Sequence, residues 1–246
     1  MKLSLVAAGA VSLALLLVGC ISYPRQAFKT PSQTPITKVA LVSVLQPEEI
    51  RVINRDGVGS TFGLIGGAVE SAVEASRTEE LKEKARDPRS LLAEHLSRAV
   101  ASELEKEGYA VSSADQQPKV VDAAAFTYDY STIATPADAV LHVWFFDVLE
   151  GGAVSYVWDA ISEAYRPNVV VCARLVNERD NSELYFQAFV YGRNYQVENI
   201  EYVPYSERYA FRDYDTLVSQ SAAASEGLVQ AVNEIGARIG AGLAAH

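Results

Sequence analysis

Cys20 is the residue whose surroundings point most directly to chemistry. It follows an apolar run over residues 3–18, which begins after the positive charge of Lys2, and the small Gly19 directly precedes it. This layout is typical of a secretory signal peptide. The run is shorter than the roughly 20 apolar residues that span a bilayer as a helix. We therefore expect residues 1–19 to be removed as a signal peptide.

The stretch Leu17-Val18-Gly19-Cys20 resembles the lipobox of bacterial lipoproteins. The resemblance implies that the Cys20 sulfur receives a diacylglyceryl group, that the peptide bond before it is cut and that the new amino group is acylated. Two or more acyl chains on one residue form a lasting anchor, whereas one chain binds a membrane only marginally. The alternative is an ordinary signal peptide followed by a chance cysteine. Because Ile21 replaces the aspartate that tends to retain family members at the inner membrane, the resemblance implies the outer membrane.

The rest of the sequence contains no pattern that predicts catalysis, a metal or a cofactor. His95, His142 and His246 lie far apart, and no Cys-x-x-Cys pair or Asp-rich calcium loop occurs. A G-x-S-x-G elbow is also absent. Cys172 lies within an apolar run over residues 169–173, where we expect a buried, inert thiol. We therefore predict a protein that is not an enzyme and that needs no cofactor or metal.

Residues 57–76 form a glycine-rich segment in which Gly59, Gly63 and Gly67 stand four residues apart. Apolar residues keep helical spacing there, although each interior glycine costs a helix about 1 kcal/mol relative to alanine. The pattern is similar to the glycine-zipper segments of some bacterial envelope proteins. That similarity implies a helix that inserts into a membrane or associates with another helix. A glycine-rich loop that leads into a surface helix from Glu70 explains the pattern equally well.

Aromatic residues gather in two segments of the second half of the chain. Tyr156, Trp158 and Tyr165 fall between two groups of expected strands, where we predict a loop. Tyrosines that could form a partner surface follow the second group: Tyr195, Tyr202, Tyr205 and Tyr209. Tyrosine suits such surfaces because it combines apolar area with a hydrogen-bonding tip. The alternative is that these side chains cover the sheet as a satellite of the core.

Charge argues against a nucleic-acid partner. Without residues 1–19 the chain keeps 20 basic and 31 acidic side chains, because only Lys2 is lost. Phosphate recognition requires clustered lysine and arginine, and here the bases are scattered among acids. The expected partners are a membrane, through the N-terminal lipid, and an envelope protein or a second copy of the chain.

The remaining pattern predicts a lipidated tether over residues 20–36 and a single periplasmic domain over residues 37–246. Pro24, Pro31 and Pro35 interrupt the tether, so we expect a flexible chain with a mean span of about 20 Å. Residues 38–45 and 138–149 are near-continuously apolar, as in buried strands, and the second of these is expected to be central. Apolar runs on both sides of a polar turn predict a β-hairpin; these runs are residues 169–176 and 184–191.

Two helices complete the prediction. Asp87-Pro88 is a strong helix start, and the helix should end at Gly108. A long amphipathic helix is expected over residues 217–243. These elements predict an α/β (α+β) fold with a mixed central sheet and helices packed on it. The element order resembles the curli-secretion, penicillin-binding-protein-activator and neisserial surface lipoproteins, which implies a scaffold for envelope assembly or secretion.

We therefore expect a non-enzymatic outer-membrane lipoprotein that faces the periplasm and acts as a protein-interaction or assembly factor. The alternative is a lipid-anchored auxiliary component of a transport system that binds a lipid or a small ligand.

Overall fold

A computed structural model of the 246-residue chain describes most of the predicted domain. The described residues are 23–29, 35–54, 63–85, 87–123, 125–147, 152–159, 162–192 and 198–244, and for residues 63–70 they comprise the backbone alone. The predicted signal peptide, Cys20, Gly59 and Tyr195 lie outside these ranges.

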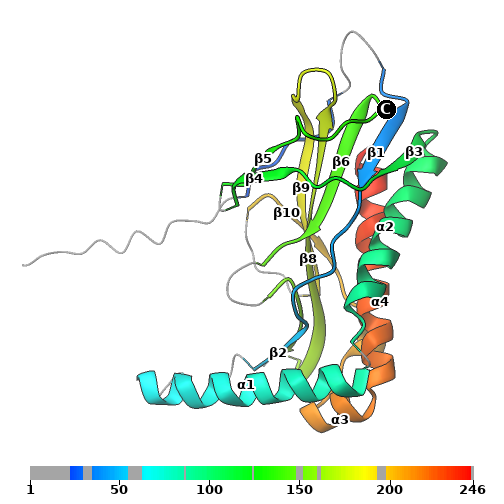
Figure 1. The fold of residues 1–246 in the computed structure, drawn as a ribbon. Coiled ribbons are helices and arrows are strands. Elements are labelled where there is room, and N and C mark those ends of the chain that lie inside the picture. Colours follow the sequence, from blue (N-terminus) through cyan, green and yellow to red (C-terminus); the bar gives the residue numbers. More distant parts are fainter. Residues whose placement is uncertain are drawn as a thin grey trace, which may run out of the picture.

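Within the described ranges, ten strands build two sheets (Figure 1). The large sheet contains β1 (Lys38–Val42), β2 (Arg51–Asn54), β3 (Ala110–Ala114), β6 (Ala139–Phe145), β7 (Val154–Asp159), β8 (Ala164–Asn177), β9 (Glu183–Tyr191) and β10 (Ile200–Val203). Its main order is β10-β9-β8-β6-β1-β3, and the pair β7 and β2 joins along β8. A small antiparallel hairpin joins β4 (Lys119–Asp122) to β5 (Thr127–Asp129). The mixed sheet and the central position of β6 confirm the prediction.

The long strand β8 connects the two halves of the large sheet. Its residues 171–177 pair with β6, its residues 164–169 pair with β7, and β9 pairs with it on the other side. The predicted hairpin is therefore confirmed, but β8 begins earlier than expected. Tyr165 consequently lies in β8, and Tyr156 and Trp158 lie in β7, so the predicted loop at these aromatics is wrong. Within this early part of β8, Pro167 pairs with Tyr156 of β7, although proline is normally excluded from paired strand positions.

Four α-helices accompany the large sheet: α1 (Gly63–Ala85), α2 (Arg89–Lys106), α3 (Tyr214–Ser219) and α4 (Ser221–Gly242). Figure 1 shows α2 and α4 side by side on one face of the sheet and α1 across one end. The apolar stripe of α2 is buried as predicted, through Leu92, Leu96, Val100 and Leu104. It packs with α4 against the odd-numbered residues of β8, such as Val171.

The predicted C-terminal amphipathic helix is confirmed as α4, but its predicted start at residue 217 is wrong, because the chain breaks at Gln220 and the preceding residues form the separate helix α3. Gln220 has φ −105° and ψ 33°, which departs from helical geometry. The Asp213 carboxylate accepts a hydrogen bond from the Thr216 amide at 2.7 Å and caps α3. Both pieces bury apolar residues, Leu217 before the break and Leu228 after it, so hydrophobic periodicity alone could not reveal the break.

Residues 23–29 and the segment that contains the β4–β5 hairpin cover the other face of the large sheet. Gln26 exchanges two backbone hydrogen bonds of 2.9 Å with Phe186 in β9, and the Lys29 amide donates to the Leu184 carbonyl at 3.0 Å. The Tyr23 side chain is only 5% exposed. This part of the predicted flexible tether is therefore docked. The reason is that β10 pairs only with residues 188–191 of β9, which leaves the backbone groups of the preceding residues to bond elsewhere.

Candidate functional site

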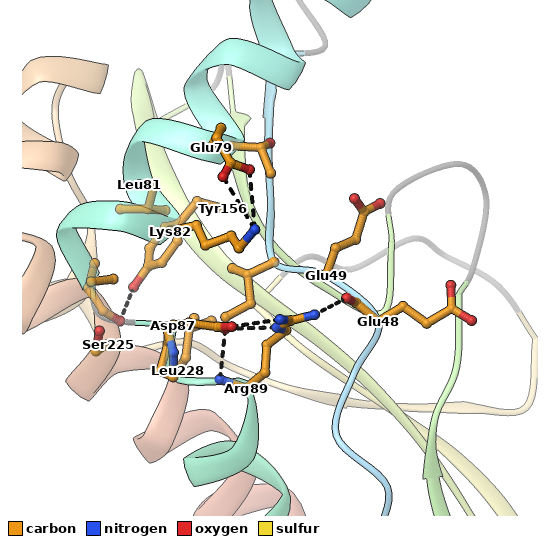
Figure 2. A pocket seen from close by; sticks show the side chains of 15 residues that line it. Glu48, Glu49, Glu79, Leu81, Lys82, Asp87, Arg89, Tyr156, Ser225 and Leu228 are labelled. Carbon is orange, nitrogen blue, oxygen red and sulfur yellow. Dashed lines mark hydrogen bonds and ion pairs between the residues drawn. The ribbon is translucent and has the colours of Figure 1, made fainter.

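A cavity of 250 Å³ lies where α1 and α2 meet α4 and the segment before β2 (Figure 2). Its apolar lining comes from Ile50, Leu81, Tyr156 and Leu228. The charged residues that line it are Glu48, Glu49, Glu79, Lys82, Asp87 and Arg89. The volume is below the roughly 300–1,000 Å³ of pockets that hold drug-sized ligands.

The inner end of this cavity is fixed by a buried tyrosine. Tyr156 in β7 donates a hydrogen bond from its hydroxyl to the Ala224 carbonyl in α4 at 2.7 Å. Gly227 lets the helix approach, because a Cβ at this position would lie 2.9 Å from the Tyr156 hydroxyl and 2.8 Å from Cγ of Tyr209. The wall is thus rigid and closely packed.

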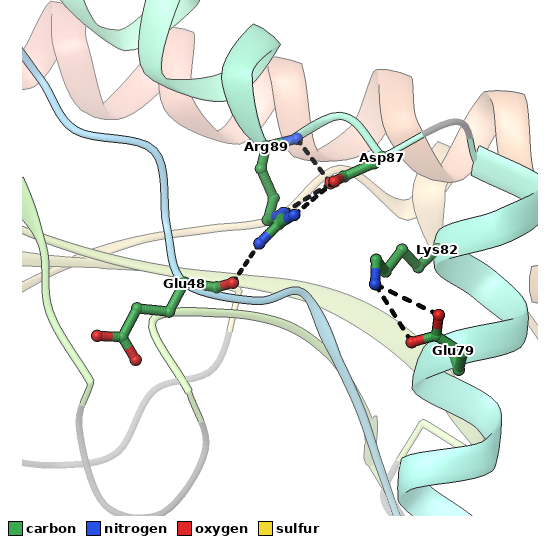
Figure 3. A network of polar contacts seen from close by, with 5 residues as sticks. All are labelled: Glu48, Glu79, Lys82, Asp87 and Arg89. Atoms are coloured by element: carbon green, nitrogen blue, oxygen red, sulfur yellow. Dashed lines mark hydrogen bonds and ion pairs between the residues drawn. The ribbon is translucent and has the colours of Figure 1, made fainter.

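Asp87 and Arg89 form the main charge pair at the cavity (Figure 3). Arg89 contacts the carboxylate through Nη2 at 2.6 Å and Nε at 2.7 Å, and it also donates to the Glu48 carbonyl. The hydrogen bonds from the Arg89 side chain lower the pKa of Asp87. The second cation, Lys82, pairs with Glu79 at 3.3 Å. Both cations are therefore paired with neighbouring carboxylates, and Asp87 is held ionised as an acceptor.

The Asp87 contact also defines the start of α2. Asp87 Oδ1 accepts a hydrogen bond of 3.4 Å from the Arg89 amide just before the helix, and the φ of Asp87 is 42°. This left-handed backbone is uncommon outside glycine. The helix begins at Arg89, directly after the predicted start signal, but Pro88 and not Asp87 occupies the N-cap position, and no side chain caps it.

A second polar cluster lies on the opposite face of the sheet, around Arg174 of β8. Arg174 is 8% exposed, and its Nε lies 2.8 Å from Oε2 of Glu183. The guanidinium also donates to the Phe126 carbonyl and lies 4.8 Å from the Phe186 ring centroid. Sequence analysis missed this residue, although an arginine inside the apolar run of residues 169–176 was the available signal.

His142 in β6 belongs to the same cluster. Its ring stacks on Trp144 with centroids 4.4 Å apart, and its Nδ1 shares a hydrogen bond of 3.2 Å with the Tyr130 hydroxyl. Burial and the nearby charge of Arg174 lower the pKa of His142 to about 3. The ring is therefore neutral at pH 7. It lies on the same face as Trp144, as a core residue.

The four tyrosines of the predicted partner surface do not share one environment. Tyr209 is 2% exposed, so its side chain contributes to the core. Tyr202 and Tyr205 are half-buried; their hydroxyls donate to the Gly192 carbonyl at 3.0 Å and to Glu207 at 2.7 Å. Tyr195 lies outside the described residues. A partner surface at Tyr202 and Tyr205 stays a prediction.

The glycine-rich segment is helical from Gly63 onward, so Gly63 and Gly67 both lie in α1. The expectation that helix begins only at Glu70 is therefore wrong for residues 63–69. Two side chains of α1 bind the backbone of β2: Glu74 accepts from the Asn54 amide at 2.9 Å and Thr78 from the Val52 amide at 3.0 Å. No helix among the described residues is long and apolar enough to span a membrane.

Other chemistry is sparse within the described ranges. Cys172 is fully buried, and burial raises the pKa of its thiol. This confirms the predicted buried thiol. No group of three or more histidine, cysteine, aspartate or glutamate side chains in those ranges could hold a metal ion.

No protein-family model and no curated protein match the chain. Among solved structures it is similar to XCC0632 of Xanthomonas campestris, a DUF330 protein, with 14% identity, TM-score 0.38, and 90% and 94% of the two chains covered. The PelC dodecamer of Paraburkholderia phytofirmans has 10% identity, TM-score 0.34 and coverages of 91% and 96%. Lipoprotein GNA1162 of Neisseria meningitidis has 14% identity, TM-score 0.25 and coverages of 66% and 85%. At these values the similarity carries no argument about function.

Proposed function

We propose that the chain is a lipid-anchored protein of the bacterial outer membrane that faces the periplasm and acts by binding another protein, without catalysis. The lipobox pattern at Cys20 supports the anchor. The charged groups at the cavity support a role without catalysis, because Asp87 pairs with Arg89 and Glu79 with Lys82, an arrangement that holds structure rather than a nucleophile next to a base. The alternative of a chance cysteine predicts a chain without acyl groups.

The observation that carries the binding role is the placement of α1. Its residues Glu74 and Thr78 bind the backbone of β2, and Figure 1 shows the first half of the helix extending beyond the sheet. With a rise of about 1.5 Å per residue, residues 63–73 reach on the order of 16 Å past Glu74. Glycines inside this part cost about 1 kcal/mol each. Close contact with the backbone of a partner helix would offset that cost.

In vivo photo-crosslinking tests the binding role. A photoreactive residue at Val73, which is 43% exposed on α1, should form an adduct with an envelope protein or with a second copy of the chain. The same residue at exposed Arg98 on α2 serves as control. Mass spectrometry identifies the adducts. Equal crosslinking at both positions, or none at Val73, would contradict a role for α1.

Leucine substitutions separate the glycine face from the rest of the same helix. Gly63→Leu and Gly67→Leu should abolish the Val73 adduct, because a side chain there keeps two backbones apart. Ser76→Leu is the matched control, since Ser76 is exposed and lies about 180° around the helix from Gly67. Adducts that persist unchanged in the two glycine variants would leave these glycines without a role in binding.

Acyl labelling tests the anchor. Radiolabelled palmitate should enter the wild-type protein, and Cys20→Ala should abolish the label and release the chain from the membrane fraction, because no acceptor thiol remains at the lipobox. An unlabelled wild-type chain would refute the lipoprotein assignment.

A second candidate function is the binding of a lipid or small ligand by an auxiliary component of a transport system. The apolar lining of the 250 Å³ cavity favours it. Native mass spectrometry of the purified protein should then show a bound small molecule that is lost in Ala85→Trp, which would fill the cavity. Copurification of a protein instead of a small molecule supports the first function.

A further inference from the structure

We propose that the β4–β5 hairpin and the docked residues 23–29 form the surface that lies against the phospholipid of the membrane. This orientation rests on the proposed lipid anchor at Cys20. It goes further, because it assigns one face of the domain to the bilayer and turns the α2–α4 face away from it.

The first step of the argument is the length of chain between the lipid and the docked segment. Only Ile21 and Ser22 separate Cys20 from Tyr23. Three steps along a fully extended chain span at most about 11 Å. Whatever the conformation of these residues, Tyr23 must lie within this distance of the lipid-bearing cysteine.

The second step is that Tyr23 is fixed to the domain. Its side chain is buried, and its carbonyl accepts a hydrogen bond from the Asn199 side chain at 3.0 Å. The backbone bonds of Gln26 with Phe186 continue the attachment, and the Gln26 side chain adds a bond to the Glu183 carbonyl at 2.8 Å. A flexible 17-residue tether over residues 20–36, as predicted, would let the domain rotate freely relative to the membrane. Docking from Tyr23 onward removes this freedom.

The third step places the β4–β5 hairpin next to this attachment. Phe126, between β4 and β5, contacts Tyr23 with ring centroids 5.5 Å apart. Figure 1 shows β4 and β5 beside the N-terminal segment, on the side of the sheet opposite α2 and α4. The hairpin presents Val120 at 56% and Val121 at 62% exposure, two consecutive large apolar side chains in water.

A phospholipid surface is the occupant that this geometry selects. The bilayer is the one partner that the acyl chains bring within about 11 Å of Tyr23 in every molecule. Exposed valines suit the boundary between headgroups and acyl chains. Arg25 and Lys29, both exposed on the docked segment, suit anionic headgroups in a chain that is otherwise acidic.

Fluorescence quenching on the full lipidated protein tests the orientation. Val121→Cys carries an environment-sensitive dye on the hairpin, and Glu94→Cys carries the same dye on α2. Cys172 is fully buried and the Cys20 sulfur is acylated, so the dye reaches only the new thiol. The proteins are reconstituted in phosphatidylethanolamine–phosphatidylglycerol vesicles that contain doxyl-labelled lipid. We expect loss of intensity at Val121 and none at Glu94.

A matched pair of proline substitutions tests whether docking sets the orientation. In the Val121→Cys background, Gln26→Pro removes the amide that bonds Phe186, and the quenching at Val121 should be lost. Ala27→Pro changes the neighbouring exposed position and should keep the quenching. If Gln26→Pro unfolds the domain, Asn199→Gly removes the side-chain bond to Tyr23 while it retains the positive φ of 64° at this position.

The outcomes are distinguishable. Acylated protein that floats with the vesicles but shows equal quenching at both dyes, or stronger quenching at Glu94, overturns the orientation and leaves the proposed anchor intact. Quenching at Val121 that persists in Gln26→Pro and in Asn199→Gly overturns the role of docking. A Cys20 found unacylated by mass spectrometry overturns the anchor and the orientation together.

Discussion

At the scale of single residues, the stability of this domain depends on buried polar side chains in β6 and β8. The buried Arg174 guanidinium contacts Glu183, the Phe126 carbonyl and the Phe186 ring. The nearby His142 ring is neutral, because burial and the Arg174 charge lower its pKa. Removal of one partner of a buried ion pair lowers the stability of the fold by more than the intact pair contributes to it. The reason is that the remaining charge stays buried without compensation.

Protonation of His142 should destabilise the domain in acid. Its pKa is about 3 in the folded state and 6.5 as the ordinary value, so the unfolded chain binds the proton more tightly. The stability from this group is fully present above pH 6.5 and falls as pH decreases below it. Between pH 7 and pH 5 the loss is about 2 kcal/mol. Urea unfolding of wild type and His142→Leu at both pH values measures it, and an equal loss in the two proteins would contradict the prediction.

Substitution of Tyr209, a core residue, provides the reference for deciding whether Tyr202 and Tyr205 belong to the core or to a partner surface. Because it packs fully buried against α4 at Gly227, Tyr209→Ala should lower the free energy of unfolding by about 3–5 kcal/mol. Tyr202→Ala with Tyr205→Ala removes two half-buried rings. If these form a partner surface, partner capture is lost at nearly unchanged stability. A stability loss as large as that of Tyr209→Ala would assign them to the core as well.

At the scale of elements, the close contact of α2 with α4 depends on small residues. A Cβ on Gly236 would lie 2.6 Å from Cβ of Ala99 and 3.2 Å from the Val100 amide nitrogen, and one on Gly240 would overlap Glu103. The glycines four residues apart in α4, Gly236 and Gly240, thus serve packing between two helices of the same domain.

Gly236→Ala should therefore destabilise the domain although alanine is the better helix former. The helix gains about 1 kcal/mol in propensity, but the added methyl overpacks the contact at a cost of about 1–3 kcal/mol, so we expect a net loss. Asn233→Ala on the exposed side of α4 is the control and should be neutral or slightly stabilising. Thermal unfolding compares the two, and a higher melting temperature for Gly236→Ala would refute the overpacking.

The elements that sequence predicted are those with a long local pattern. The stripe of α2, the apolar run of β6 and the hairpin of β8 with β9 each repeat their period over several residues. The pair of β2 with β7 was missed because β2 is four residues long and its partner follows about a hundred residues later. The same limit applies to the sites. The lipobox is contiguous, whereas the cavity joins Ile50, Tyr156 and Leu228 from distant segments.

At the scale of the whole molecule, the large sheet has two unlike faces. Two helices cover one, and irregular chain with a short hairpin covers the other, including residues 23–29. The flexible tether was predicted from its prolines, which describe the segment alone. Residues 23–29 bind the part of the β9 edge that β10 leaves uncovered, because β10 pairs only with residues 188–191. No local pattern in the sequence reveals this long-range pairing.

Release of the docked segment should be measurable as stability. Gln26→Pro removes one of the two backbone bonds with Phe186 and strains the other, so we expect a loss of about 1–3 kcal/mol in the free energy of unfolding. Ala27→Pro should change it little. Chemical denaturation of both variants measures the difference, and equal stability would show that the docked segment adds nothing to the fold.

The Gln26 contact also has a consequence for the order of events during biogenesis. Gln26 and Glu183 are 157 residues apart, so a segment that is synthesised early binds a strand that is synthesised much later. At about 5–20 residues per second, synthesis of that interval takes on the order of ten seconds or more. Throughout this time the predicted lipobox would have no folded domain beside it. A modifying enzyme would therefore meet Cys20 on an open peptide, and the closing of the N-terminal segment onto β9 would follow as a late folding step.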